Sequence, residues 1–194
     1  MTRSTDFERS TKETTITGSI DLDGAGMARV DTGLGFLDHM IQTLARHSKF
    51  DLELAVSGDT HVDDHHTVED VAIVLGRALD EVLGDRKGIT RFGHSYAPLD
   101  EALCRAVVDL SGRGWAELVL PVPRETIGDV ASENLRHFLS SLAVEARMTL
   151  HIDLIRGENS HHIAESAFKA LALAMGTAVR VSGDAVPSTK GTLQ

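Results

Sequence analysis

Cysteine is almost absent from this chain of 194 residues, in which Cys104 is the only one. A single cysteine forms no internal disulfide and does not build a cysteine-based zinc site. Aromatic residues are also scarce, at 4% against 42% hydrophobic residues, which predicts a core of aliphatic side chains. No apolar run approaches the ~18 residues of a spanning helix, and the N-terminal stretch lacks the apolar segment of a signal peptide. We therefore expect a soluble, cytoplasmic protein with no membrane partner.

Positive charge is in short supply as well. The chain has 19 basic and 29 acidic residues and a formal net charge of −10. This balance argues against binding to nucleic acid or to an anionic membrane, both of which need a basic surface. An anionic ligand would have to meet a local cluster of Lys and Arg side chains. The length suffices for one substantial core or for two half-sized units packed together.

The strongest pattern is a repeated motif of two adjacent histidines followed, three residues later, by a glutamate. The motif is formed by His65, His66 and Glu69, and again 96 residues later by His161, His162 and Glu165. Two such matches are expected by chance in roughly one chain of this composition in a thousand. Because neutral imidazole and carboxylate suit borderline divalent metals, the repeat predicts two halves of a metal site.

The pattern of apolar residues predicts the same order of elements in each half: two or three strands, a helix, a strand and a helix. In the first half the predicted strands are 14–21, 27–31 and 51–57, and the predicted helices are 36–47 and 65–83. In the second half the strands are 91–96, 104–109, 115–119 and 149–155, and the helices are 134–147 and 161–181. Asp23-Gly24 indicates a turn that pairs 14–21 with 27–31 as a hairpin. The order is typical of α+β proteins, with antiparallel sheets that carry two helices on one face.

Helix geometry limits what one motif can bind. Adjacent helical residues point ~100° apart, so His65 and His66 diverge, while Glu69 neighbours both. Each motif can therefore offer one histidine with its glutamate to one ion and its other histidine to a second ion. His39 and His137 lie in the first helix of each half and supply the further histidine that each site needs.

Basic residues offer candidates for an anion site. Arg113 stands between two glycines, which let a phosphate approach its guanidinium. Further candidates are Arg91, Lys169 and the pair of Ser188 and Lys190 in the C-terminal tail. Spacing alone does not bring these residues together.

Several strings of the chain resemble one known family. They include Thr-Gly-Leu-Gly-Phe-Leu-Asp-His-Met at 32–40, Asp-Asp-His-His-Thr-Val-Glu-Asp at 63–70, Arg-Phe-Gly-His at 91–94, Pro-Leu-Asp-Glu-Ala at 98–102, His-His-Ile-Ala-Glu at 161–165 and Pro-Ser-Thr-Lys-Gly at 187–191. In order and without a large gap, these strings resemble imidazoleglycerol-phosphate dehydratase of histidine biosynthesis, in its monofunctional form. The resemblance runs from about Arg9 to the C-terminus.

The resemblance implies an architecture. The family has a duplicated fold like the second domain of ribosomal protein S5, which implies one dehydratase domain over 1–194. Its pseudo-repeats would cover about 9–86 and about 87–184, followed by a tail at 185–194. The resemblance also implies a homo-oligomeric shell of 24 subunits, with two Mn²⁺ in each active site between subunits. The implied metal ligands are His39, His65, His66, Glu69, His137, His161, His162 and Glu165.

The resemblance also implies a reaction, the dehydration of D-erythro-imidazole-glycerol phosphate to imidazole-acetol phosphate. Two metals on the ring nitrogens would stabilise an imidazolate and so make the ring an electron sink. The implied phosphate contacts are Arg91, Arg113, Lys169, Ser188 and Lys190. Glu13 is the candidate proton carrier, beside Glu69 and Glu165 in the catalytic set.

Two alternatives remain open from the residues. The first is a dinuclear metallohydrolase of a phosphate ester, which would release phosphate where a dehydratase retains it. The second is a non-enzymatic metal-storage shell, in which Arg91, Arg113 and Lys190 have no role.

Overall fold

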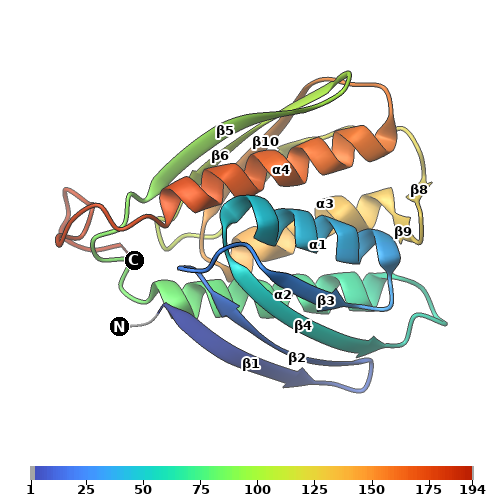
Figure 1. The fold of residues 1–194 in the computed structure, drawn as a ribbon, viewed down its shortest axis with the longest axis horizontal. Helices are drawn as coiled ribbons and strands as arrows, with labels where there is room; N and C mark the ends of the chain where they lie inside the picture. The colour runs from blue at the N-terminus through green and yellow to red at the C-terminus, as the bar shows by residue number, and fades with distance from the viewer. Residues whose placement is uncertain (1–2, 194) are drawn as a thin grey trace.

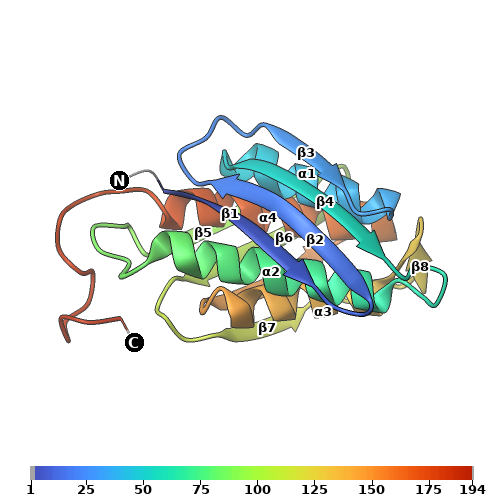
Figure 2. The same cartoon turned by 90° about the horizontal axis from the view of Figure 1, so that it is seen from below.

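The structure is a computed structural model that describes residues 3–193, so the outermost ends of the expected domain, residues 1, 2 and 194, lie outside it. Two four-stranded sheets form the outer layers and four helices lie between them (Figures 1 and 2). The α+β class and the repeated order of elements are thus confirmed. No helix within residues 3–193 is long and apolar enough to cross a membrane.

The first half contains one sheet and two helices. Its strands are β1 (Ser4–Ser10), β2 (Thr14–Asp21), β3 (Ala28–Asp31) and β4 (Asp51–Gly58), in the order β1-β2-β4-β3. Its helices are α1 (Gly35–Ser48) and α2 (His65–Leu83). All but one of the contacts between neighbouring strands are antiparallel, the exception being β3 beside β4.

The second half repeats this arrangement. Its strands are β5 (Phe92–Leu99), β6 (Ala102–Asp109), β7 (Trp115–Val119) and β10 (Thr149–Arg156), in the order β5-β6-β10-β7, with β7 parallel to β10. Its helices are α3 (Ser132–Glu145) and α4 (Ser160–Ala178). A short hairpin of β8 (Thr126–Ile127) and β9 (Val130–Ala131) precedes α3.

The predicted hairpin between 14–21 and 27–31 is wrong. β2 is flanked by β1 on one side and by β4 on the other, so neither of its edges is left for β3. β3 instead pairs with the far edge of β4, in parallel. The strand β1 was not predicted, because its alternation contains a single large apolar residue, Phe7, among polar side chains.

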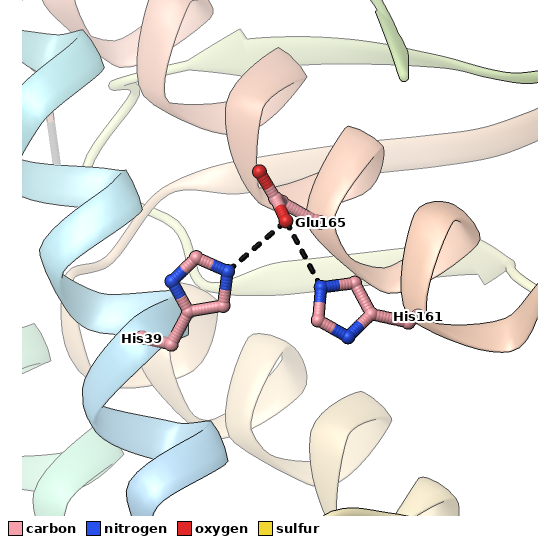
Figure 3. A group of neighbouring side chains, drawn as sticks. All are labelled: His39, His161 and Glu165. Carbon is pink, nitrogen blue, oxygen red and sulfur yellow. Dashed lines mark hydrogen bonds and ion pairs between the residues drawn. The ribbon is translucent and has the colours of Figure 1, made fainter. Parts of the chain in front are cut away.

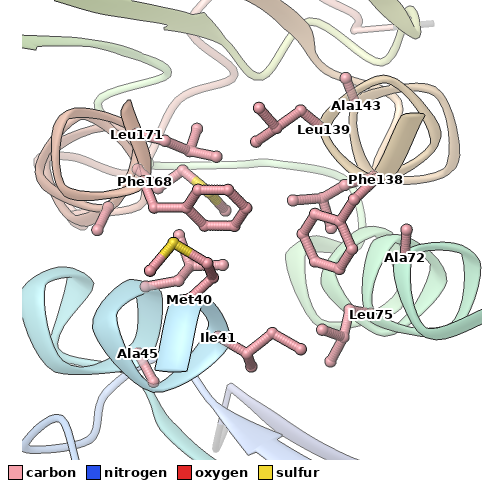
Figure 4. Close-up of a cluster of buried hydrophobic side chains, with 14 of the residues drawn as sticks. Met40, Ile41, Ala45, Ala72, Leu75, Phe138, Leu139, Ala143, Phe168 and Leu171 are labelled. Atoms are coloured by element: carbon pink, nitrogen blue, oxygen red, sulfur yellow. The ribbon is translucent and has the colours of Figure 1, made fainter. Parts of the chain in front are cut away.

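The core joins the two halves through their helices. Helix α1 packs on α4, and α2 packs on α3, so that each pair combines one helix from each half. Figure 4 shows their side chains meeting in the middle, where the rings of Phe138 and Phe168 lie 5.7 Å apart. On α1 the inward stripe has helical spacing, with Leu37, Met40 and Ile41 fully buried. This pairing holds the first turns of α1 and α4 side by side.

Candidate metal centres and anion pocket

The Glu165 cluster consists of His39, His161 and Glu165, and it joins α1 to α4. Oε2 of Glu165 lies 3.0 Å from Nε2 of His39 and 3.1 Å from Nε2 of His161 (Figure 3). His161 and Glu165 are one turn apart on α4, whereas His39 comes from the other half of the chain. Two imidazole nitrogens and a carboxylate oxygen therefore converge across the boundary between the halves.

The Glu69 cluster consists of His65, Glu69 and His137, and it joins α2 to α3 in the same way. Nε2 of His137 lies 3.0 Å from Oε1 of Glu69, and Nε2 of His65 lies 3.9 Å from Oε2. The rings of His65 and His137 are stacked, with centroids 5.0 Å apart. In each cluster one ligand atom per residue lies within 4.8 Å of the others, a spacing that could hold a metal ion. Nitrogen with carboxylate oxygen is also a donor set that suits Mn²⁺ or Zn²⁺.

Polar side chains fix the helix ends that carry these histidines. Asp129 of the β8–β9 turn accepts hydrogen bonds from the first amides of α1, those of Gly35 at 2.6 Å and Phe36 at 3.0 Å. The first half makes the reciprocal contact: Asp64, just before α2, accepts a hydrogen bond of 2.8 Å from the amide of Ala131, just before α3. Asn159 caps α4 by accepting from the amide of His161 at 2.9 Å. Carboxylates thus tie each half to the start of a helix in the other.

His66 and His162 point away from the two clusters, as the helical geometry predicted. Nδ1 of His66 lies 3.0 Å from Asp59, and Nδ1 of His162 lies 2.7 Å from Glu101. These hydrogen bonds leave Nε2 of each ring available, and they raise the pKa of both imidazoles. The hydrogen bond with His162 in turn lowers the pKa of Glu101 to about 2.

The sequence pattern did not identify Asp59 and Glu101 as the partners of these histidines. Both carboxylates lie in connecting segments, where such residues are usually solvated. A hydrogen bond on Nδ1 orients an imidazole and directs Nε2 toward a ligand. Oε1 of Glu13, the candidate proton carrier, lies 3.8 Å from Nε2 of His66.

The basic candidates gather into one place, with one exception. Arg91, Arg113, Ser188 and Lys190 line a cavity of about 570 Å³ between β5 and the C-terminal tail. The Arg91 guanidinium donates to both carboxylate oxygens of Asp109, at 2.7 and 3.1 Å, and to the Pro187 carbonyl at 2.8 Å. We call this cavity the anion pocket, because it presents two guanidinium groups, an ammonium and a hydroxyl.

Lys169 is the exception, since it lies at the Glu165 cluster. Its Nζ is 2.7 Å from Oε1 of Glu165. Burial of the Glu165 carboxyl favours the neutral acid, but hydrogen bonds from Lys169 and His39 outweigh it and lower the pKa of Glu165 to about 2. The carboxylate is therefore ionised and ready to act as a ligand throughout the physiological range.

The anion pocket and the metal clusters lie at opposite ends of α4. The backbone amide of Arg91 bonds to the carbonyl of Ala178, the last residue of α4, whereas His161 lies in its first turn. At 1.5 Å per residue these two points are roughly 26 Å apart. Figure 1 shows the tail that lines the pocket at the left and the β8–β9 end at the right.

The fold and these clusters together define a duplicated α+β protein with two His/Glu sites that could bind metals. Comparison with known proteins identifies the family. The family model for imidazoleglycerol-phosphate dehydratase matches residues 32–175 of this chain. The chain belongs to this family of hydro-lyases of histidine biosynthesis. Membership favours a dehydratase over both the phosphate-ester hydrolase and the storage shell.

Individual relatives agree with the family model. The chain is 50% identical to imidazoleglycerol-phosphate dehydratase of Magnetococcus marinus, over 100% of this chain and 99% of the relative. It is 54% identical to the enzyme of the same name from Phytophthora nicotianae over 98% of its own length, but spans only 42% of that longer relative. Crystal structures of the dehydratases from Staphylococcus aureus and Pyrococcus furiosus superpose with TM-scores of 0.84 and 0.83, at 37% and 35% identity. They cover 92% and 96% of this chain, and 99% and 100% of their own.

Proposed function

We propose that the protein dehydrates D-erythro-imidazole-glycerol phosphate to imidazole-acetol phosphate and water, in the biosynthesis of L-histidine, with two Mn²⁺ in each active site. The observation that carries the proposal is the pair of nitrogen-rich clusters, at 3.0 and 3.1 Å around Glu165 and at 3.0 and 3.9 Å around Glu69. Two ions held there would stabilise negative charge on the imidazole ring of the substrate. The chain's own residues bind, orient and exchange protons with the substrate.

The six histidines and two glutamates of the repeated motifs and their upstream partners are the proposed metal ligands. The three members of each cluster already face one another. His66 and His162 lie outside the clusters, with Nδ1 hydrogen-bonded to a carboxylate and Nε2 left available. Because these two rings diverge from the clusters of their own chain, we propose that they complete sites on neighbouring copies. This arrangement gives each site three histidines and one glutamate.

The proposed phosphate contacts are Arg91, Arg113, Ser188 and Lys190 in the anion pocket, with Lys169 from another copy. Five single bonds separate the ring from the phosphorus in this substrate, a span under about 8 Å. The roughly 26 Å along α4 between pocket and cluster exceeds it. One chain therefore cannot hold both ends of one substrate, which supports active sites between subunits. We propose that the chain forms the 24-subunit shell that the family resemblance implies.

Glu13 is the proposed proton carrier. Its carboxylate lies 3.8 Å from Nε2 of His66 in a half-exposed position in the β1–β2 turn, so it can reach both solvent and the substrate. Loss of hydroxide from the glycerol chain needs a proton, and a solvent-accessible carboxylic acid next to the ring can supply it.

The test is an assay of the metal-free protein, reloaded with Mn²⁺, on imidazoleglycerol phosphate. We expect imidazole-acetol phosphate to form without release of inorganic phosphate, and the activity to disappear on chelation. Release of phosphate would instead identify a hydrolase, and tight Mn²⁺ binding without turnover would refute the proposed reaction. Glu13→Gln is expected to lower kcat by 10²–10⁴-fold while Mn²⁺ binding is unchanged.

A further inference from the structure

The two clusters are built from equivalent residues, but they are not electrostatically equivalent. Each contains a histidine and a glutamate one turn apart on a helix and a histidine from the facing helix. One turn beyond the glutamate the sequences differ: Lys169 follows Glu165, whereas Ile73 follows Glu69. The repeat therefore places a cation at one centre and an aliphatic side chain at the other.

Lys169 forms an ion pair with the carboxylate of Glu165, the same group that contacts the two histidines of the cluster. Oε2 of Glu165 faces His39 and His161, and Oε1 lies 2.7 Å from Nζ of Lys169. Both partners are shielded, with side chains 13% exposed for Glu165 and 20% for Lys169. Shielding from water strengthens the pairing and fixes the ammonium beside the ligand atoms.

Glu69 has a different environment. Oε1 faces His137 at 3.0 Å, Oε2 faces His65 at 3.9 Å, and the side chain is 38% exposed. Within residues 3–193 its ion pairs are with these two histidines alone, and the ring of His65 is backed by the neutral amide oxygen of Asn134 at 3.1 Å. No lysine or arginine of the described residues therefore forms an ion pair with Glu69.

We propose that the two centres bind divalent metal with unequal affinity, and that Lys169 makes the Glu165 centre the weaker one. The inference rests on the proposed metal-dependent function. A divalent ion at this centre shares its carboxylate with an ammonium, which both neutralises the ligand and repels the ion. Even with water-like screening this repulsion lowers affinity by roughly tenfold or more. The Glu69 centre then fills first, and the Glu165 centre sets the metal concentration at which the enzyme becomes fully loaded.

Mn²⁺ titration of the full-length metal-free protein tests the proposal, with free Mn²⁺ followed by electron paramagnetic resonance and heat by calorimetry. We expect two classes of site, one ion of each per chain, with dissociation constants at least about tenfold apart. Glu165→Gln should remove the weak class and Glu69→Gln the tight class. One class of two equivalent ions in the wild-type protein would overturn the inference but leave the proposed function intact. No Mn²⁺ binding at all would overturn both.

Three variants assign the difference to Lys169. Lys169→Met should bring the two dissociation constants together by strengthening the weak class, whereas Lys169→Arg should keep them apart. Ile73→Lys is the mirror substitution, and it should weaken the tight class. An unchanged ratio in Lys169→Met, with the fold verified by circular dichroism, would exclude Lys169 as the cause.

Discussion

His39 and Glu165 are 126 residues apart in the sequence, yet Nε2 of one lies 3.0 Å from Oε2 of the other. The contact forms because α1 of the first half packs on α4 of the second. His137 reaches Glu69 across the other pair of helices at the same distance. Each candidate metal centre is therefore also a joint between the two halves, and its geometry depends on the helix starts that the opposite half holds in place.

Asp129 is expected to stabilise the joint by capping α1. Asp129→Ala removes the acceptor for the amides of Gly35 and Phe36, and we predict a loss of about 1 kcal/mol in the free energy of unfolding. Asp129→Asn keeps one acceptor oxygen and should lose less. Urea denaturation of the metal-free protein measures both values. Equal stability of the wild-type and alanine proteins would show that the cap contributes nothing.

Arg91 is expected to orient phosphate through its fixed guanidinium. Arg91→Lys keeps the charge but loses the two-pronged bond to Asp109, so we predict a KM higher by roughly 10- to 100-fold with Mn²⁺ binding unchanged. Steady-state kinetics with separate kcat and KM measure the effect. The matched control is Arg105→Lys, whose guanidinium bonds to Asp153 in the second sheet. An equal rise in KM for both variants would contradict a specific role of Arg91.

Much of the fold could be predicted from the sequence, because the helices carry continuous apolar stripes. Helix α2 begins and ends where the pattern predicts, at His65 and Leu83. The position of β3 could not be predicted, because its only well-buried residue, Val30, marks a strand without identifying the neighbour. β3 cannot pair with β2 because β1 occupies the edge of β2 that β4 leaves free. The polar alternation of β1 gives little indication in the sequence that it is a strand.

The repeated motif pointed to the histidines and glutamates of the two clusters, but how they group could not be predicted. Spacing on a helix shows that His65 and His66 diverge, yet it does not show that His65 meets His137. That choice depends on how the halves pack. The partners on Nδ1, Asp59 and Glu101, also come from connecting segments, so no helical or strand period marks them.

Gly76 is expected to be required for the close approach of α2 to α3. A Cβ at this position would lie 2.6 Å from Cβ of Glu145 and 3.0 Å from the amide nitrogen of Ala146. We predict that Gly76→Ala lowers the free energy of unfolding by about 1–2 kcal/mol, the overpacking exceeding the gain of ~1 kcal/mol in helix propensity. Thermal and urea denaturation give the value. Gly183→Ala, where a Cβ meets nothing within 4 Å, is the control and should change stability little.

Metal binding is expected to release protons, and Glu101 should set how many. Its hydrogen bond raises the pKa of His162, so a larger fraction of this imidazole is protonated near neutral pH than in an ordinary histidine. The same hydrogen bond stabilises the metal-free fold at pH values below about 6.5, the pKa of His162 in the unfolded chain. This stabilisation is lost as pH rises through the higher pKa of His162 in the folded protein. Metal affinity runs in the opposite direction, because an ion must displace the proton, and it should fall as pH decreases through that range.

Glu101→Gln removes the charge that favours protonated His162. We predict fewer protons released per Mn²⁺ near pH 7, and a fall in Mn²⁺ affinity that begins at a lower pH than in the wild-type protein. Calorimetry in two buffers with different ionisation enthalpies counts the protons, and Glu117→Gln, on the exposed strand β7, is the control. Proton release that is identical in Glu101→Gln and the wild type would show that Glu101 does not control the charge of His162.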